Sequence, residues 1–234
     1  MIEAVGLSHQ GLVRANNEDQ FYASCEHGLV VLADGMGGAQ AGETASLVAV
    51  QSVVDVANSD VPSPSLLESA FLEADLRVRA LAEEDPQLKG MGTTLVAMLE
   101  TPAGLAVTSI GDSRGWLWED GGLTLLTSDN SWVNEIGRNL GLSEEALSTH
   151  PLRHALTTAI GVGVEHRVQS QVIHPRPDSM ALLSSDGLHG VVPPGEIAAV
   201  FADGGTLASI AHTLIELALE AGGPDNVTVV VARF

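Results

Sequence analysis

Short apolar runs bounded by turn residues recur along most of the chain and predict strands. The opening Ile2–His9 is strand-like, and Phe21–Cys25 and Leu29–Ala33 are separated only by Glu26-His27-Gly28, which predicts a hairpin. Four later runs with turns between them predict an antiparallel meander: Thr93–Leu99, Leu105–Ile110, Gly115–Trp118 and Leu123–Thr127. Further strands are expected at Val168–Ile173, Met180–Ser184 and Val227–Val231.

Three other stretches place apolar residues every three or four positions and predict helices: Ala41–Asn58, Leu66–Glu84 and Thr206–Ala221. Ser65 and Glu68 have the spacing of a capping box at the start of the second helix. Residues 128–155 are less apolar and are expected to form a surface excursion, in which Ser143, followed by acidic residues, begins a short helix. No repeat, linker or composition break is visible, so we expect one α+β domain over residues 1–234.

Composition narrows the classes of partner. The formal net charge is −20, from 30 acidic and 10 basic residues, and a negative surface repels nucleic acids and anionic lipid. We therefore expect neither a nucleic-acid nor a membrane partner. The N-terminus has no signal-peptide pattern and no apolar run is long enough to span a membrane, which predicts a cytoplasmic protein. The one cysteine, Cys25, lies in an apolar run and is interpreted as a buried structural thiol.

Four aspartates share one sequence setting. Asp34, Asp112, Asp186 and Asp225 each lie at the edge of an apolar strand, next to glycine or a turn. Aspartate is common at strand ends because it forms turns, which is the simplest explanation for any one of them. Four such positions favour a cluster instead, and clustered buried carboxylates repel each other unless a cation neutralises them.

The donor set predicts the kind of cation. Carboxylate oxygens, with no thiolate and no His-x-x-x-His pair, favour Mg²⁺ or Mn²⁺ over zinc, with Ca²⁺ possible. Two such ions about 3.5–4 Å apart can clamp a phosphate and activate a water molecule. Arg14 is the only Lys or Arg before Arg77 and stands close to Glu18 and Asp19. It suggests an anion site, with a surface salt bridge as the equal alternative.

One motif points to a different hydrolase chemistry and is discounted. Gly111-Asp-Ser-Arg-Gly115 matches the G-x-S-x-G nucleophile elbow, which must run from a strand into a helix. Here Trp116-Leu117-Trp118 continues as a strand, so the elbow is not expected.

Six short motifs occur in an order that resembles a known family. They are Arg14-x-x-Asn17-Glu18-Asp19, Asp34-Gly-Met-Gly-Gly38, Met91-Gly-Thr-Thr94, Gly111-Asp-Ser-Arg114, Ser185-Asp-Gly-Leu188 and Gly223-Pro-Asp-Asn-Val-Thr228. Together they resemble the PPM, or type-2C, metal-dependent Ser/Thr protein phosphatases of bacterial type. The resemblance implies two packed, mostly antiparallel β-sheets flanked by α-helices on both sides. It also implies hydrolysis of phosphoserine and phosphothreonine by metal-activated water.

The resemblance further implies roles for individual residues. Two or three Mn²⁺ or Mg²⁺ ions would be held by these residues: Asp34 and the Gly35 carbonyl, Asp186, Asp225, the weaker ligand Asp112, and Glu18 in or just outside the ligand set. Asp19 would orient a water held by the metals, and Arg14 would bind the substrate phosphate. Residues 128–155 would form a mobile flap. Phosphorylated proteins, including a cognate Ser/Thr kinase, are the expected partners of a monomer.

Some positions depart from the family pattern. Asp129-Asn130-Ser131 stands where members often carry Asp-His-Ser, and Met36 stands where a histidine would be an obvious proton donor. His189 is a candidate donor, although a surface loop residue is the favoured interpretation. The alternatives for the whole chain are a catalytically weak phosphoprotein-binding module, a phosphatase of small phosphoesters, and a structural Ca²⁺-binding protein.

Overall fold

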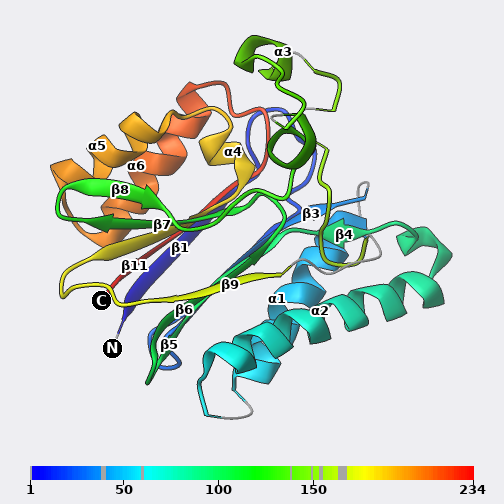
Figure 1. Cartoon of the computed structure of the whole chain (residues 1–234), viewed down its shortest axis with the longest axis horizontal. Coiled ribbons are helices and arrows are strands. Elements are labelled where there is room, and N and C mark those ends of the chain that lie inside the picture. Colours follow the sequence, from blue (N-terminus) through cyan, green and yellow to red (C-terminus); the bar gives the residue numbers. More distant parts are fainter. Residues whose placement is uncertain are drawn as a thin grey trace.

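Two β-sheets packed face to face form the centre of the protein, with helices on both outer faces (Figure 1). The computed structural model describes residues 2–37, 41–58, 61–137, 139–148, 150–152, 155–162 and 168–234. All strand pairs in it are antiparallel; the pairs of β1 and β11 and of β2 and β3 are examples. The expected α+β class, with two sheets between helical layers, is confirmed.

The strands divide between the sheets as follows. The first sheet has the order β1 (Glu3–His9), β11 (Val227–Arg233), β10 (Met180–Ser184), β7 (Arg114–Glu119) and β8 (Gly122–Leu125). The second has the order β2 (Asp19–Ser24), β3 (Leu29–Met36), β5 (Leu95–Thr101), β6 (Gly104–Ile110) and β9 (Gln169–Ile173), with β4 (Gly92–Thr93) paired to the end of β3. The N- and C-terminal strands are neighbours, so the two chain ends lie side by side in Figure 1.

The helices cover the two sheets separately. α1 (Ala41–Ala57) and α2 (Pro64–Glu84) lie against the second sheet, followed by a 3₁₀ turn at Pro86–Leu88. The first sheet carries α4 (Asp186–His189), α5 (Pro194–Asp203) and α6 (Leu207–Glu220). A π-helical turn (Val133–Gly137) and α3 (Glu144–Ser148) belong to the 128–155 excursion, which projects away from the sheets.

Aliphatic side chains build three apolar layers, because aromatic residues are only 3% of the chain. Leu67, Phe71 and Val53 are buried between the helices and the second sheet. Leu32 and Leu183 are buried between the two sheets. Full burial of side chains of this size contributes about 1.5–3 kcal/mol each, so the sandwich is a rigid support for loops at its ends.

The structure corrects several sequence-based expectations. The predicted meander is not continuous: β5–β6 and β7–β8 pair, but within the described residues β6 and β7 belong to different sheets. The cap of α2 is Ser63, whose hydroxyl accepts the Leu66 N–H, and not Ser65. Cys25 is exposed, because β2 ends at Ser24 and the thiol lies in the turn. The helices α4 and α5 were not predicted.

No helix in the described part of the chain is both long enough and apolar enough to cross a membrane.

Candidate functional site

The predicted aspartates come from both sheets at one end of the sandwich. Asp19 is the first residue of β2 and lies directly opposite Asp34 of β3 in the strand register. Asp112 lies in the segment that crosses from β6 in one sheet to β7 in the other. Asp186 is the first residue of α4, and Asp225 precedes β11 by two positions. The sequence thus correctly placed Asp112, Asp186 and Asp225 next to strand ends, whereas Asp34 lies within β3, which continues to Met36 because Gly35 and Met36 pair with β4.

Their electrostatics show that these carboxylates act on one another. Burial raises the pKa of Asp34 well above its usual value, and the charges of Asp19, Asp186, Asp112 and Asp225 raise it further. Burial likewise raises the pKa of Asp19 to about 7, where Asp186 and Asp225 add to the effect. For Asp112, burial and then Asp186 raise the pKa to about 7. The structure thus brings the five side chains into one electrostatic unit that favours bound positive charge.

One carboxylate oxygen of this unit gives a second indication that the site binds a ligand. Asp19 is 3% exposed, and its Oδ2 accepts a hydrogen bond from the Ser185 hydroxyl at 2.8 Å. Its Oδ1 is buried and has no hydrogen-bond partner among the described residues. An unsatisfied buried carboxylate oxygen is costly, so a cation or a water held by one fits this position.

The donor set fits hydrated divalent ions. Among the described residues, no three Asp, Glu, His or Cys side chains converge as a ready-made closed set of ligands. Mg²⁺ and similar ions need only one or two carboxylates each, because they retain several waters. All the side-chain donors here are oxygens, which suits Mg²⁺ or Mn²⁺ and not a structural zinc site.

The backbone around Asp34 is fixed by close packing. The Gly35 N–H donates to the Glu18 carbonyl at 3.2 Å. A Cβ at Gly35 would lie 2.1 Å from the Gly42 carbonyl oxygen, so no other residue fits there without movement. Gly42 in turn leaves room for the Glu18 carboxylate beside the first turn of α1, where a negative charge is favourable.

Arg14 is half-exposed beside the cluster. Its Nη2 donates to the Asp225 carboxylate at 2.6 Å, and the Arg14 side chain is 55% exposed. Asn226 holds the surrounding loop: its Nδ2 donates to the carbonyls of Gln10 and Asn16, and its Oδ1 accepts the Glu18 N–H. The sequence motif included Asn226, but its structural task became apparent only from these hydrogen bonds.

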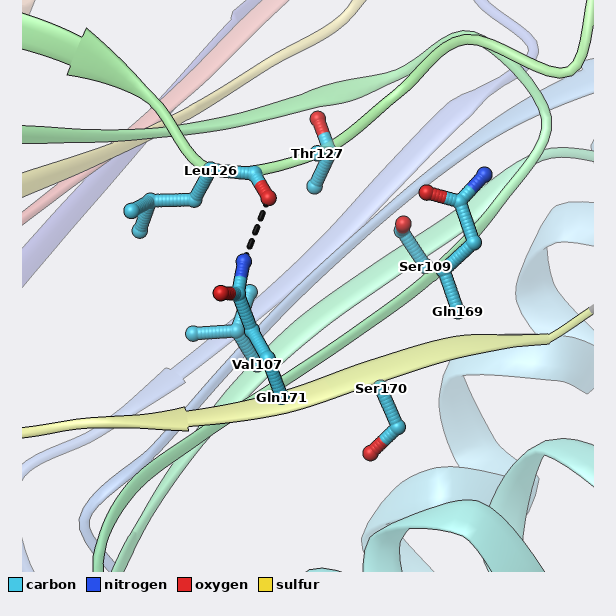
Figure 2. A pocket seen from close by; sticks show the side chains of 7 residues that line it. All are labelled: Val107, Ser109, Leu126, Thr127, Gln169, Ser170 and Gln171. Atoms are coloured by element: carbon cyan, nitrogen blue, oxygen red, sulfur yellow. Dashed lines mark hydrogen bonds between the residues drawn. The ribbon is translucent and has the colours of Figure 1, made fainter.

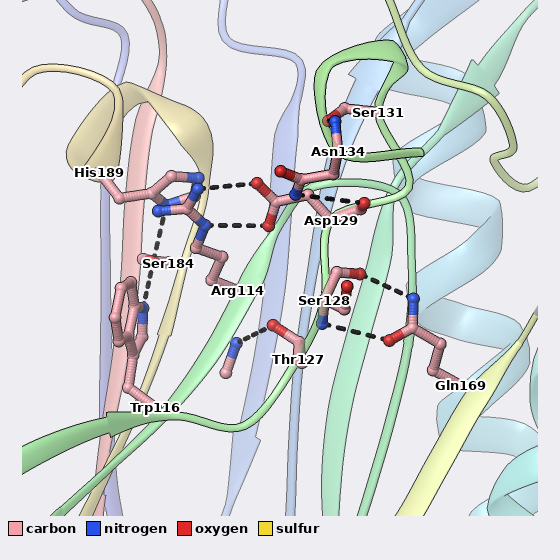
Figure 3. A network of polar contacts seen from close by, with 11 residues as sticks. Arg114, Trp116, Thr127, Ser128, Asp129, Ser131, Asn134, Gln169, Ser184 and His189 are labelled. Carbon is pink, nitrogen blue, oxygen red and sulfur yellow. Dashed lines mark hydrogen bonds and ion pairs between the residues drawn. The ribbon is translucent and has the colours of Figure 1, made fainter. Parts of the chain in front are cut away.

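The first residues of the 128–155 excursion are attached to the Asp112 segment by a polar network (Figure 3). Arg114 contacts both oxygens of Asp129, at 3.0 and 2.7 Å. Asn130 exchanges hydrogen bonds with Gly111, since its N–H donates to the Gly111 carbonyl and its Oδ1 accepts the Gly111 N–H. Asn130 Nδ2 also donates to Glu135 in the π-helical turn. Asn130 therefore fastens this part of the 128–155 excursion to the segment that carries Asp112.

His189 is packed into the same network and does not lie on a surface loop. Its Nδ1 is 3.0 Å from the Ser184 hydroxyl, which also accepts the indole N–H of Trp116 (Figure 3). Burial, and then the nearby Arg114 charge, lower the pKa of His189 well below its usual value. A neutral imidazole is a poor proton donor, so this geometry argues against His189 as the general acid.

Comparison with known proteins agrees with this architecture. The family model for protein phosphatase 2C matches residues 5–209. The chain belongs to the protein phosphatase 2C family. The serine/threonine protein phosphatase PstP of Mycobacterium tuberculosis is 41% identical over 228 residues, which cover 96% of this chain and 43% of PstP. The chain thus spans less than half the length of that relative.

One further relative and one solved structure match along most of their length. The serine/threonine phosphatase stp of Listeria innocua is 33% identical over 233 residues, covering 96% of this chain and 92% of that protein. A crystal structure of the PstP catalytic domain, in complex with two manganese ions, superimposes with a TM-score of 0.87 at 38% identity. It covers 99% of this chain and 97% of that one.

A polar cavity of about 190 Å³ is lined by residues of β6, of β9 and of the segment after β8 (Figure 2). Gln169 and Gln171 of β9 reach across it, and their amides donate to the carbonyls of Ser128 and Leu126. Its lining is uncharged: Val107, Ser109, Leu126, Thr127, Gln169, Ser170 and Gln171. The cavity therefore lacks the charge needed to bind a phosphate ester.

Proposed function

We propose that this member of the phosphatase 2C family is a metal-dependent protein serine/threonine phosphatase. The observation that carries the proposal is the electrostatic unit of five aspartates at one end of the sandwich. Two Mn²⁺ or Mg²⁺ ions, with a third site of lower affinity, would neutralise it and supply an activated water for attack on phosphorus.

The proposed metal-binding roles follow the positions of the carboxylates. Asp34 and Gly35 lie together near the end of β3, and in this proposal Asp34 would bridge two ions and the Gly35 carbonyl would bind one of them. Asp186 and Asp225 would hold one of these ions, and Asp112 with Asp186 the third. Glu18 lies at the edge of this set.

The chain's own groups would do the remaining work. Arg14 would bind the phosphate, because its guanidinium lies beside the aspartate unit, is 55% exposed and can offer two parallel N–H donors. The unpartnered Oδ1 of Asp19 is suited to accept a proton or a hydrogen bond from a nearby water. Burial lowers the pKa of His189, which disfavours it as the proton donor to the leaving serine or threonine oxygen.

Replacement of Arg14 by alanine is expected to raise KM for a phosphopeptide about tenfold and to lower kcat less. The guanidinium interacts with phosphate charge that is already present in the bound substrate, so its loss weakens binding first. Steady-state kinetics at saturating Mn²⁺ measure this split. Arg176→Ala is the matched control, because Arg176 is 64% exposed and pairs with acids in the remote β7–β8 turn. A fall in kcat with unchanged KM would contradict this role.

The substrate class is tested by comparing a phosphothreonine peptide with a small chromogenic phosphoester. A protein phosphatase would show the higher kcat/KM with the peptide, whereas a small-molecule enzyme would show the reverse. A phosphoprotein-binding module would bind the peptide without releasing phosphate. A structural Ca²⁺-binding protein would gain stability from metal and show no turnover.

We further propose that the natural partners are phosphorylated proteins, including a cognate Ser/Thr kinase in the cytoplasm. The net charge of −20 disfavours nucleic acids and anionic membranes as alternatives.

We also propose a monomer made of one domain over residues 1–234, in which the 128–155 flap shapes access of the substrate. The attachment of Asn130 to Gly111 supports the flap as part of this unit.

A further inference from the structure

The hydrogen-bond ladder of the second sheet changes at Asp34. The registers of β3 with β4 and of β3 with β5 place Thr94, which lies between β4 and β5, opposite Asp34. The Thr94 N–H donates to the Asp34 carbonyl at 2.9 Å, as in an ordinary ladder. The return bond is different, because the Asp34 N–H donates at 2.9 Å to the Thr94 hydroxyl and not to its carbonyl. The hydroxyl of Thr94 therefore replaces a backbone acceptor at this aspartate.

The same hydroxyl reaches the segment that carries Asp112. Thr94 Oγ1 lies 2.7 Å from Ser113 Oγ, and both residues are buried, at 3% and 2% exposure. On the other side of Asp112, a Cβ added to Gly111 would lie 2.8 Å from the Thr94 Cβ. Gly111 has φ +98°, a conformation that favours glycine, so this close approach is built into the backbone.

We propose that Thr94 is a positioning residue that joins the Asp34 and Asp112 positions through the Thr94–Ser113 hydroxyl pair. It fixes the backbone of Asp34 directly, and it fixes the Asp112 segment by contact with the residues before and after Asp112. Since β6 and β7 lie in different sheets, this bond also spans the point where the chain passes between them. The inference rests on the proposed function, in which both aspartates hold metal ions.

The consequence is a coupling between metal-binding positions. Metal ligands that the fold already holds at a fixed separation do not have to be ordered when an ion binds. Hydrogen-bonding partners that orient such ligands typically raise metal affinity by about 10–100-fold. Loss of the Thr94 hydroxyl would leave the buried Asp34 N–H without its acceptor and release Ser113. Both positions would then loosen, although neither carboxylate had been changed.

The test is Mn²⁺ binding, measured by calorimetric titration of the purified chain, for Thr94→Val, Thr94→Ser, Ser113→Ala and the Thr94→Val/Ser113→Ala double variant. Thr108→Val is the matched control, because Thr108 is a fully buried threonine of β6 whose hydroxyl bonds Ser170 and not this pair. Melting curves in EDTA show that each variant is folded before the titration.

We expect Thr94→Val to weaken Mn²⁺ binding about tenfold, while Thr94→Ser and Thr108→Val remain within about threefold of wild type. Ser113→Ala should also weaken binding, and the double variant should be no weaker than Thr94→Val, because both single changes remove the same bond. Wild-type Mn²⁺ affinity in Thr94→Val, or an equal loss in Thr94→Ser, would overturn the inference.

The same titration separates this inference from the proposed function. If wild type binds Mn²⁺ and hydrolyses a phosphopeptide but Thr94→Val binds Mn²⁺ equally well, only the role of Thr94 is wrong. If wild type itself binds no Mn²⁺, the proposed function fails and the inference fails with it.

Discussion

Asp34→Asn is expected to lower turnover of a phosphothreonine peptide by about 10³-fold or more, and at the same time to stabilise the metal-free protein. The activity falls because a neutral amide cannot bridge two cations. The stability rises because burial and the surrounding aspartates disfavour the ionised form of Asp34, which the unfolded chain adopts freely at neutral pH. Phosphate release with Mn²⁺ and melting temperature in EDTA measure the two effects.

Lower turnover together with higher stability of the metal-free protein distinguishes a metal ligand from a turn-forming aspartate. Loss of a turn-forming aspartate would lower stability and leave turnover unchanged. Asp178→Asn is the matched control, because Asp178 is an exposed turn residue with φ +69° where asparagine is also tolerated. Normal turnover by Asp34→Asn would show that Asp34 does not bridge two metal ions.

The metal-free protein is expected to lose stability as pH rises from about 4 to above 7, and Mn²⁺ is expected to restore it. Burial raises the pKa of Asp19 and of Asp112 from 3.8 to about 7 in the folded state. The folded state therefore binds more protons than the unfolded state within this window, so unfolding becomes easier with increasing pH. Mn²⁺ binds the deprotonated carboxylates, so its effect should be larger at pH 8 than at pH 5.

The expected size follows from mass action. An ion present at 100 times its Kd stabilises the folded state by about 2.7 kcal/mol per site, or about 5 kcal/mol for two sites. For a chain of this length, that corresponds to a melting-temperature increase of about 10 °C or more. Thermal unfolding at pH 5 and pH 8, with EDTA or Mn²⁺, gives the four values needed. An equal Mn²⁺ effect at both pH values would show that the buried aspartates are not the binding groups.

Much of this fold could be predicted because neighbouring residues in the sequence determine where its hairpins and helices begin and end. The hairpin of β2 and β3 follows from two apolar runs with a short turn, and it places Asp19 opposite Asp34. The bounds of α1 and α6 were predicted within about one residue, since apolar spacing and the glycines after α6 define them. The four strand-edge aspartates were predicted as a group for the same reason.

The remaining features depend on contacts between distant segments. The chain leaves one sheet for the other between β6 and β7, although each strand alone is as apolar as a meander would require. The Thr94 hydroxyl, which replaces a ladder carbonyl, also contacts Ser113, which is 19 residues away in the chain. His189 was expected in a surface loop, because nothing in its sequence neighbourhood indicates that Ser184 and Arg114 surround it.

The central claim is that the aspartate unit performs metal-dependent hydrolysis of phosphoserine and phosphothreonine in proteins. The most direct measurement is phosphate release from a phosphothreonine peptide by the purified chain, with and without Mn²⁺. We expect steady turnover with Mn²⁺, none in EDTA, and recovery when Mn²⁺ is added back in excess. Turnover that is unchanged by EDTA, or no turnover in Mn²⁺ and in Mg²⁺ by the folded protein, would contradict it.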